Sequence, residues 1–207
     1  MTALSQILEH KIVAILRGMP PTEILNIANA LYNGGVRILE ITLNSESALP
    51  AIEQLNHELK NKMLIGAGTV INKKDAGNAI AAGATFLISP SLDVEVIKAA
   101  NDANVVSIPG AFTPTEIIAA HKSGADIIKL FPCLNADYVK NILAPLNFIK
   151  LMPTGGIDAS NIQTFAKTGA VAFGIGSALV NSKATIDEAY LENITAKAKQ
   201  LMAALHS

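Results

Sequence analysis

Four segments of the chain begin with a glycine, continue with a small or branched residue and then run into β-prone residues. They are residues 35–41, 83–89, 124–130 and 169–175. Each glycine follows a stretch with helical patterning, and glycine favours the left-handed backbone that ends many helices. The repeat therefore predicts a helix followed by a strand as the structural unit of the chain.

Four more apolar runs of β-type residues lie between these segments, at residues 11–16, 63–67, 105–109 and 148–153. Helix-patterned stretches join successive runs, so eight short apolar strands alternate with helices. Such alternation predicts a parallel sheet that is buried on both faces. Closed on itself, this sheet is a (β/α)8 TIM barrel; an open doubly wound sheet is the alternative, because counting elements does not prove closure.

The 207 residues contain no linker or low-complexity stretch, so we expect residues 1–207 to form a single α/β domain. The first ten residues alternate polar and apolar side chains at helical spacing, which predicts an N-terminal helix before the barrel. Barrels of this kind have about 250 residues, so this one is short and leaves little chain for lids or inserted domains.

Composition narrows the partners that the chain is expected to have. Charged residues make up 16% of the sequence, against about 25% in typical domains, and the apolar excess favours a buried subunit interface. A formal charge of -1 without long basic runs predicts no nucleic-acid or membrane partner. No secretory signal or run of membrane-spanning length is recognisable, so the cytoplasm is the expected compartment.

Lys129 stands within an apolar strand, residues 127–131. Burying an ammonium group is unfavourable, so the site must pair the charge or lower the pKa of the lysine until the amine is neutral. A neutral amine is a nucleophile that forms Schiff bases with carbonyl substrates. The alternative is a lysine whose stem lies on apolar surface while its ammonium group reaches water.

The glycine repeat also supplies a register for the barrel interior. The fifth residue after each glycine is Glu40, Ile88, Lys129 or Gly174. In a barrel, alternate strands contribute the four side chains of one interior layer. Glu40 and Lys129 are therefore expected to face each other across the barrel, with Gly174 leaving room between them; a plain buried ion pair is the alternative.

Glycine-rich segments follow the seventh and eighth strands, where barrels often bind phosphate. Glycine lets backbone N–H groups approach an anion closely, and a following helix start adds a favourable dipole. The segments therefore predict a phosphate site rather than ordinary tight turns. Its residues are Gly155 and Gly156 after the seventh strand, and Gly176 and Ser177 after the eighth.

Polar side chains at other strand ends suit substrate binding. Arg17 ends the first strand, and its planar guanidinium group matches a carboxylate or phosphate. Thr69 and Thr154 offer hydroxyl groups, although threonine is also common in strands. The histidines fall in helical or terminal segments and no dinucleotide fingerprint occurs, so we expect neither a metal nor a cofactor. The single cysteine, Cys133, is expected to be a structural thiol.

The motifs in this order resemble those of the 2-keto-3-deoxy-6-phosphogluconate (KDPG) and 4-hydroxy-2-oxoglutarate (KHG) aldolase family over almost the whole chain. They are Val13-Ala14-Ile15-Leu16-Arg17, Gly34-Gly35-Val36, Leu39-Glu40-Ile41-Thr42, Gly66-Ala67-Gly68-Thr69-Val70, Ile88-Ser89-Pro90, Ile108-Pro109-Gly110, Lys129-Leu130-Phe131-Pro132 and Pro153-Thr154-Gly155-Gly156-Ile157.

The resemblance implies a trimeric class I aldolase on a (β/α)8 barrel that cleaves a phosphorylated keto acid to pyruvate and glyceraldehyde 3-phosphate. It implies that Lys129 forms the Schiff base and that Glu40 is the general acid and base. Arg17, Thr69 and Thr154 would hold the part that becomes pyruvate. The phosphate would lie against the glycine-rich segments.

Asn44 departs from the gluconate-type members, many of which carry an arginine there that binds the substrate carboxylate. The Leu-Asn-Ser segment is instead similar to members acting on the 6-phosphogalactonate epimer. Cleavage of 4-hydroxy-2-oxoglutarate is a further alternative, as are a phosphosugar epimerase and a non-catalytic phosphosugar-binding barrel. The opposed acids or strand-end histidines typical of an epimerase are missing, and an intact pair of Glu40 and Lys129 argues against a mere binding protein.

Overall fold

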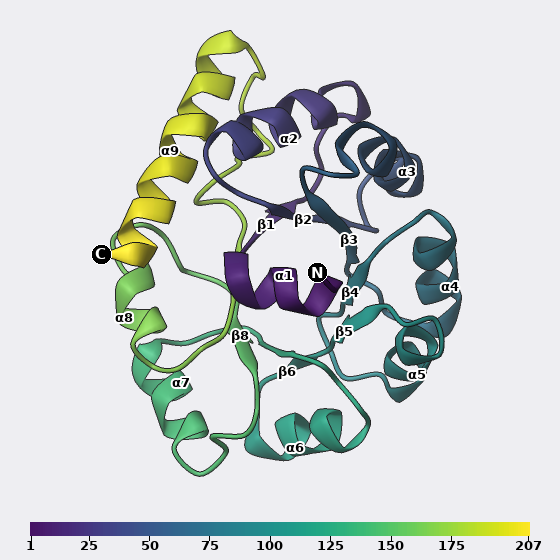
Figure 1. Cartoon of the computed structure of the whole chain (residues 1–207), viewed down its shortest axis with the longest axis vertical. Helices are drawn as coiled ribbons and strands as arrows, with labels where there is room; N and C mark the ends of the chain where they lie inside the picture. The colour runs from purple at the N-terminus through teal and green to yellow at the C-terminus, as the bar shows by residue number, and fades with distance from the viewer.

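A computed structural model, which describes residues 1–207, shows parallel strands arranged in a ring with helices around it (Figure 1). The strands pair in the orders β5-β4-β3-β2-β1-β9 and β6-β7-β8, all in parallel. Their bounds are Ile12–Leu16 (β1), Ile38–Thr42 (β2), Leu64–Gly68 (β3), Phe86–Ile88 (β4), Val106–Ile108 (β5), Gly110–Ala111 (β6), Ile128–Leu130 (β7), Leu151–Pro153 (β8) and Phe173–Ile175 (β9).

Two junctions close the ring. Only Pro109 separates β5 from β6, so these two pieces form one barrel strand; proline has no N–H group to continue the ladder. A bridge between Thr154 and Gly174 joins β8 to β9, which pairs with β1. The predicted (β/α)8 barrel is thus confirmed, and the open doubly wound sheet is wrong.

Helices follow the strands and cover the outside of the ring, as predicted from the alternating pattern (Figure 1). Four of them are followed two or three residues after their last residue by a glycine with φ between +91° and +99°, a backbone that glycine adopts without strain; these are Gly35, Gly83, Gly124 and Gly169. No helix has the length and apolar character needed to cross a membrane. The helices are Ala3–His10 (α1), Ile24–Asn33 (α2), Ala48–Leu59 (α3), Lys73–Ala81 (α4), Val94–Asp102 (α5), Pro114–Lys122 (α6), Ala136–Leu143 (α7), Ile162–Ala166 (α8) and Glu188–His206 (α9), with a 3-10 turn at Pro21–Glu23.

One predicted strand is shorter than expected. The apolar run 148–153 forms strand only from Leu151, because Phe148 is 57% exposed on the connection that follows α7. Because the prediction relied on apolar character alone, it began the strand three residues too early. The other strand predictions agree with the structure to within a few residues.

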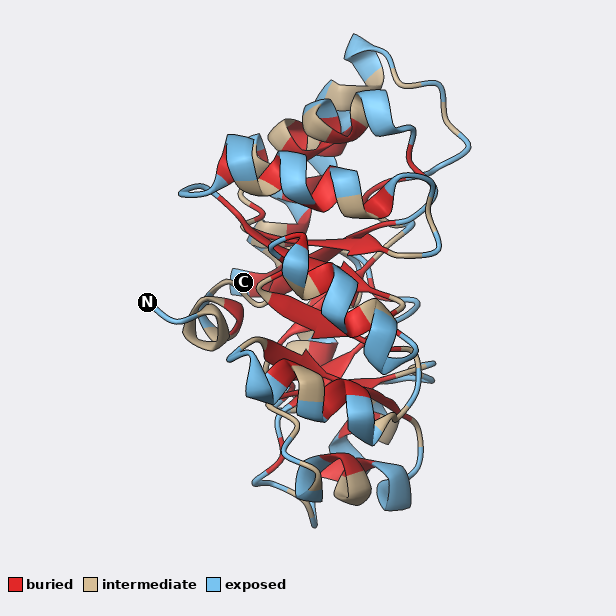
Figure 2. Ribbon diagram, turned by 90° about the vertical axis from the view of Figure 1, so that its right-hand side faces the viewer, coloured by how far each residue is buried: buried red, intermediate tan, exposed pale blue.

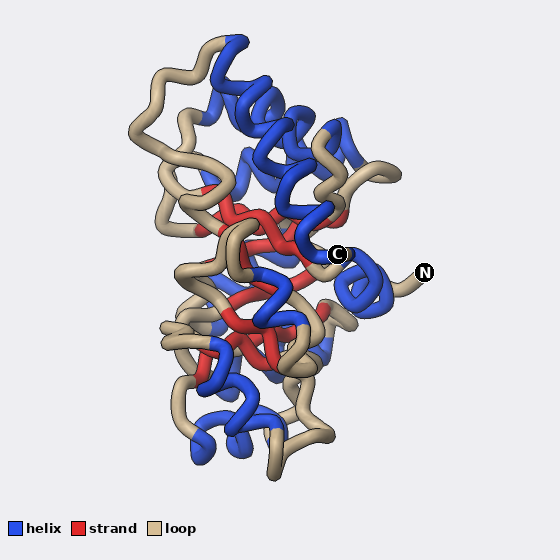
Figure 3. The backbone as a smooth tube through the Cα atoms, turned by 90° about the vertical axis from the view of Figure 1, so that its left-hand side faces the viewer, coloured by secondary structure: helices blue, strands red, loops and turns tan.

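The strands are buried on both faces, and each helix turns its buried side to them (Figure 2). Successive side chains in a strand point to opposite faces. In β2, Ile38 belongs to the apolar cluster inside the barrel, whereas Leu39 belongs to the larger cluster between the strands and the helices. Helix α1 lies across the ring at its amino end (Figures 1 and 3), where Ile7 joins the interior cluster.

Replacing Ile7 by alanine should destabilise the fold, because the side chain is fully buried and closes the barrel. We expect I7A to lower the free energy of unfolding by about 2–5 kcal/mol. Ile71, which is 54% exposed, offers the same substitution as a control, and I71A should change stability by no more than about 0.5 kcal/mol. Urea unfolding of both variants measures this; equal stabilities would contradict the role of α1 as a closure of the barrel.

Candidate active site

Glu40 and Lys129 lie inside the barrel, on strands β2 and β7. Two residues earlier in the chain, Ile38 and Ile127 belong to the interior apolar cluster, so Glu40 and Lys129 point inward as well. The exposed fractions of the two residues are 0% and 3%. The structure therefore brings the carboxyl and amino groups into one interior space, away from bulk water.

The two groups are not joined as an ion pair. Contacts within salt-bridge distance join only Lys73 to Glu95 and the His57 ring to Glu58, both on the surface. Both carboxylate oxygens of Glu40 are buried without a hydrogen-bond partner. An unsatisfied buried carboxyl group is unfavourable, so its presence calls for an explanation outside fold stability.

Burial shifts both groups toward their neutral forms. It raises the pKa of Glu40 above its ordinary value, and the opposing effects of the Lys129 and Arg17 charges are smaller. Burial likewise lowers the pKa of Lys129; Glu40 partly offsets this effect, while Arg17 adds to it. A neutral amine can attack a carbonyl group, and a carboxyl group with a raised pKa can both accept and donate protons near neutral pH.

Glycines shape the space around these groups. A Cβ atom at Gly68 would overlap the Glu40 carboxyl group, so this glycine provides the room that the acid occupies. The expectation that Gly174 leaves empty room between Glu40 and Lys129 is wrong, because a Cβ atom there would overlap the Thr154 side chain. The space beside Gly174 is filled by the side chain of Thr154, which directly follows β8.

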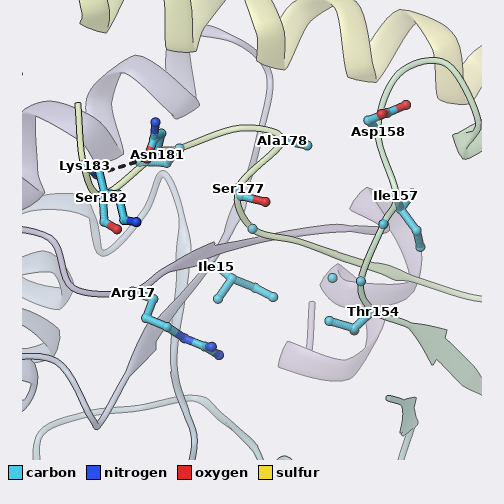
Figure 4. Close-up of a pocket in the computed structure, with 15 residues that line it drawn as sticks. Ile15, Arg17, Thr154, Ile157, Asp158, Ser177, Ala178, Asn181, Ser182 and Lys183 are labelled. Carbon is cyan, nitrogen blue, oxygen red and sulfur yellow. Dashed lines mark hydrogen bonds between the residues drawn. The ribbon is translucent and has the colours of Figure 1, made fainter. Parts of the chain in front are cut away.

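A cavity of about 640 Å³ opens at the carboxyl ends of the strands (Figure 4). Gly155 and Gly156 have φ values of +107° and +67°, which side chains rarely tolerate, so the loop after β8 depends on glycine. The cavity gathers most of the residues predicted to bind substrate, namely Arg17, Thr154, Gly155, Gly156, Gly176 and Ser177. Glycine-rich backbone and an arginine thus line one hollow, a combination that suits an anion.

Two of the predicted substrate-binding residues lie outside this cavity. Thr69 directly follows β3, is half-buried and has a φ of +57°, an unusual backbone for a β-branched residue. Asn44 is exposed on the loop after β2. Neither lines the cavity, nor do the buried Glu40 and Lys129.

Sequence patterns missed a contact that fixes the loop next to Arg17. The Gly18 N–H group donates to the Ser45 Oγ atom at 2.8 Å, and that hydroxyl lies 2.9 Å from the hydroxyl of buried Thr42. This contact ties the loop after β1 to the loop after β2. Only the position of Ser45 after a strand could have suggested it, since serine is common in turns.

Lys183 is a second cation that sequence patterns did not predict for this site. It lines the cavity from the loop after β9, where its backbone N–H group donates to the Asn181 Oδ1 atom at 3.0 Å (Figure 4). Asp158 lines the same cavity and accepts hydrogen bonds from Ser160, which lower its pKa. Lys183 lies beyond the glycine motif after β9 and carried no signal, whereas Asp158 ends the glycine-rich segment after β8 but was not predicted to line the site.

Cys133 and the histidines add no further reactive group. Burial raises the pKa of the Cys133 thiol to about 11, and a thiolate rather than a thiol is the nucleophilic form of cysteine. This agrees with the predicted structural role. No group of three or more histidine, cysteine, aspartate or glutamate side chains is placed to hold a metal ion.

An amine whose pKa is lowered by burial, in the same barrel interior as a carboxyl group, is the arrangement of a Schiff-base lyase. The fold and site together define a class I aldolase. The family model described as KDPG and KHG aldolase matches residues 4–197, and the chain belongs to this family.

Curated relatives cover most of the chain. A probable 2-dehydro-3-deoxy-6-phosphogalactonate aldolase of Rhizobium meliloti is 34% identical over 83% of this chain and 82% of its own length. A 2-dehydro-3-deoxy-phosphogluconate aldolase of Dickeya dadantii is 36% identical over 86% of this chain and 84% of its own. The chain is therefore similar to enzymes named for both epimers.

Solved structures agree with this fold. A native KDPGal structure matches with a TM-score of 0.88 and 29% identity over 94% of both chains. A KDPG aldolase from Legionella pneumophila, solved with pyruvate captured as a covalent carbinolamine intermediate, has a TM-score of 0.81 and 27% identity over 98% of both chains.

Substituting Gly68 by alanine should impair catalysis with little effect on folding of the outer layers. The added methyl group must displace the Glu40 carboxyl group, and misplacing a catalytic group by about 1 Å can cost about 100-fold in rate. Gly77 in α4 has open space around its Cβ position, so G77A is the matched control and should retain full activity. Steady-state aldol cleavage by both variants measures the effect; full activity in G68A would show that Glu40 needs no such room.

Proposed function

We propose that residues 1–207 form one catalytic domain that cleaves 2-keto-3-deoxy-6-phosphogluconate to pyruvate and glyceraldehyde 3-phosphate. The observation that carries this proposal is the Lys129 amine, which is buried, has a lowered pKa and shares the barrel interior with unpaired Glu40. The relatives named for KDPG cleavage and the neighbour with covalently captured pyruvate support the same chemistry.

In the proposed reaction, the neutral Nζ atom of Lys129 attacks the C2 ketone of the substrate. Loss of the ketone oxygen as water leaves an iminium ion, whose positive nitrogen accepts the electrons of the C3–C4 bond. The Phe131 ring, whose centroid lies 4.8 Å from Nζ, offers its π face to the cationic nitrogen. Stabilising the cation favours the covalent intermediate.

Glu40 accepts and donates the protons of the proposed reaction. Its carboxylate form takes the C4 hydroxyl proton as the C3–C4 bond breaks, and glyceraldehyde 3-phosphate leaves. The enamine that remains is protonated at C3, with Glu40 as the relay. Water then adds to the iminium and frees pyruvate and the Lys129 amine. All protons move through side chains or water, so the scheme requires no cofactor.

The cavity supplies the binding groups of the proposal. The glycine backbone and the Ser177 hydroxyl bind the phosphate, and Arg17 and Thr154 hold the carboxylate and keto end. Thr69 directly follows β3, which pairs with β2, the strand of Glu40, and it is therefore assigned to the carboxylate and keto end of the substrate. Ser45, through Gly18, positions the loop that carries Arg17.

Treatment with pyruvate and borohydride should attach a reduced pyruvate adduct to Lys129, because reduction makes the imine bond permanent. Peptide mass spectrometry locates the adduct. The variant K129M keeps an apolar stem of similar length but should take up no pyruvate, whereas K140M, at an exposed lysine of α7, should react like the wild type. An adduct on any other lysine, or the absence of an adduct, would refute the assignment of Lys129 as the Schiff-base residue.

Cleavage of the galactonate epimer is the second candidate function. Asn44 stands where gluconate-type members carry an arginine, and a relative named for the phosphogalactonate substrate is 34% identical. Both observations favour an enzyme that accepts the inverted C4 centre.

Placing an arginine at position 44 should shift the preference toward the gluconate substrate. We expect N44R to raise the ratio of the two kcat/KM values, gluconate over galactonate, by about tenfold. Residue 44 follows β2, the strand of Glu40, which takes the C4 hydroxyl proton, and C4 is where the epimers differ. A hydrogen bond from a charged group to one C4 epimer and not to the other is worth about that much. N33R makes the same change at an exposed position at the end of α2 and should leave the ratio unaltered. Equal wild-type rates on both epimers, unchanged in N44R, would refute a role for Asn44.

A homotrimer is the proposed assembly. The low share of charged residues and the exposed side chains of Leu134 and Phe148 support an apolar interface between copies. Sedimentation should give a species of three chain masses, and a monomer at working concentration would refute the trimer. The phosphorylated substrate supports the cytoplasm as the compartment, which cell fractionation tests.

A further inference from the structure

A second cavity, of about 410 Å³, opens at the opposite end of the barrel from the candidate active site. Arg37 directly precedes β2 and Met63 directly precedes β3, so the cavity lies at the amino ends of the strands. Its size falls within the range of about 300–1,000 Å³ that small-ligand sites occupy. Helix α1, the end of α2 and the turns into β2 and β3 supply its lining: Met1, Gln6, His10, Tyr32, Arg37, Lys60, Asn61, Lys62 and Met63.

Positive charge is concentrated in this cavity. Arg37, Lys60 and Lys62 line it, no aspartate or glutamate does, and none of the three cations forms an ion pair. The cavity between α2 and α9 contains Glu188 and Glu192 instead. Unpaired cations that converge on a hollow, in a chain with a formal charge of -1, create a local field that attracts anions.

Arg37 is held in a fixed orientation. Its Nη1 atom donates to the carbonyl oxygens of Tyr32 and Val36, both at 2.9 Å, and its guanidinium carbon lies 4.1 Å from the centre of the Tyr32 ring. The Nε and Nη2 atoms have no hydrogen-bond acceptor in the protein. A planar donor group that is already positioned loses little conformational freedom when it binds an oxyanion.

We propose that this cavity binds a small multivalent phosphate anion of the diphosphate class. The free edge of Arg37 takes two anion oxygens, and the flexible ammonium groups of Lys60 and Lys62 close over the others. Gln6 adds a neutral donor from α1. An anion bound here links α1 to the turns that enter β2 and β3, and it thereby stabilises the closure of the barrel.

The competing explanation is that these cations only stabilise helix ends. Lys60 caps the carboxyl end of α3, where positive charge interacts favourably with the helix dipole. That role needs no ligand and requires no convergence on a cavity. Binding measurements separate the two explanations, because a helix-end role predicts no affinity for pyrophosphate at this end of the barrel.

Calorimetric titration with inorganic pyrophosphate, at an ionic strength held constant with sodium chloride, tests the site. The double variant K60Q/K62Q should bind one equivalent per chain fewer than the wild type. The matched control K140Q/K150Q removes two exposed lysines elsewhere and should bind like the wild type. Aldolase activity, and its inhibition by pyrophosphate, should be the same in all three proteins because the altered lysines lie away from the candidate active site.

Thermal unfolding gives an independent readout. Pyrophosphate should raise the Tm of the wild type and of K140Q/K150Q more than that of K60Q/K62Q. Absence of binding to the wild type, equal binding by all three proteins, or equal loss in both double variants would each overturn the proposal. None of these outcomes bears on the pyruvate adduct at Lys129, so the failure of this site and the failure of the proposed function are distinguishable.

Discussion

The burial of an unpaired amine and an unpaired carboxyl group in the barrel interior is the constraint on which the rest of the site depends. Leaving Lys129 and Glu40 without an ion pair costs stability, because a buried charge without a partner is among the least favourable arrangements in a protein. The surrounding apolar layers, closed by α1 at one end, offset that cost. The same burial shifts both pKa values toward the neutral forms that carbonyl chemistry requires.

The two ends of the barrel differ in a way that follows from strand direction. Apolar side chains such as Val13, Ile38 and Leu64 fill the amino end of the interior, and Ile7 of α1 packs on them. Toward the carboxyl end the inward positions change to Glu40, Lys129 and glycine. Stability is thus concentrated at one end and chemistry at the other, which is why a substitution at Ile7 should affect folding and one at Gly68 should affect rate.

Periodicity in the sequence was enough to predict the strands, the helix ends and the interior position of Lys129. Each of these depends on local spacing, because the glycine at a helix end and the alternation along a strand act within a few residues. Contacts between strands were not predictable in this way. Whether Gly174 faces empty space or Thr154 depends on the tilt and stagger of β9 against β8, which no local pattern records. The contact of Ser45 with Gly18 joins two loops that are separate in sequence, and it was missed for the same reason.

Interior glycines in this barrel make room for larger side chains from neighbouring segments, which occupy the positions where the Cβ atoms would lie. The Cβ position of Gly66 is filled by the Phe86 ring, that of Gly68 by Glu40 and that of Gly174 by Thr154. In a closely packed interior, a methyl group added at such a position must displace the side chain that fills it, so each glycine fixes the placement of one larger residue. For Phe86 the result is a packed core, whereas for Glu40 and Thr154 it is the placement of a buried polar side chain. The geometry of the candidate active site therefore depends on glycine at positions 68 and 174 as much as on the polar side chains themselves.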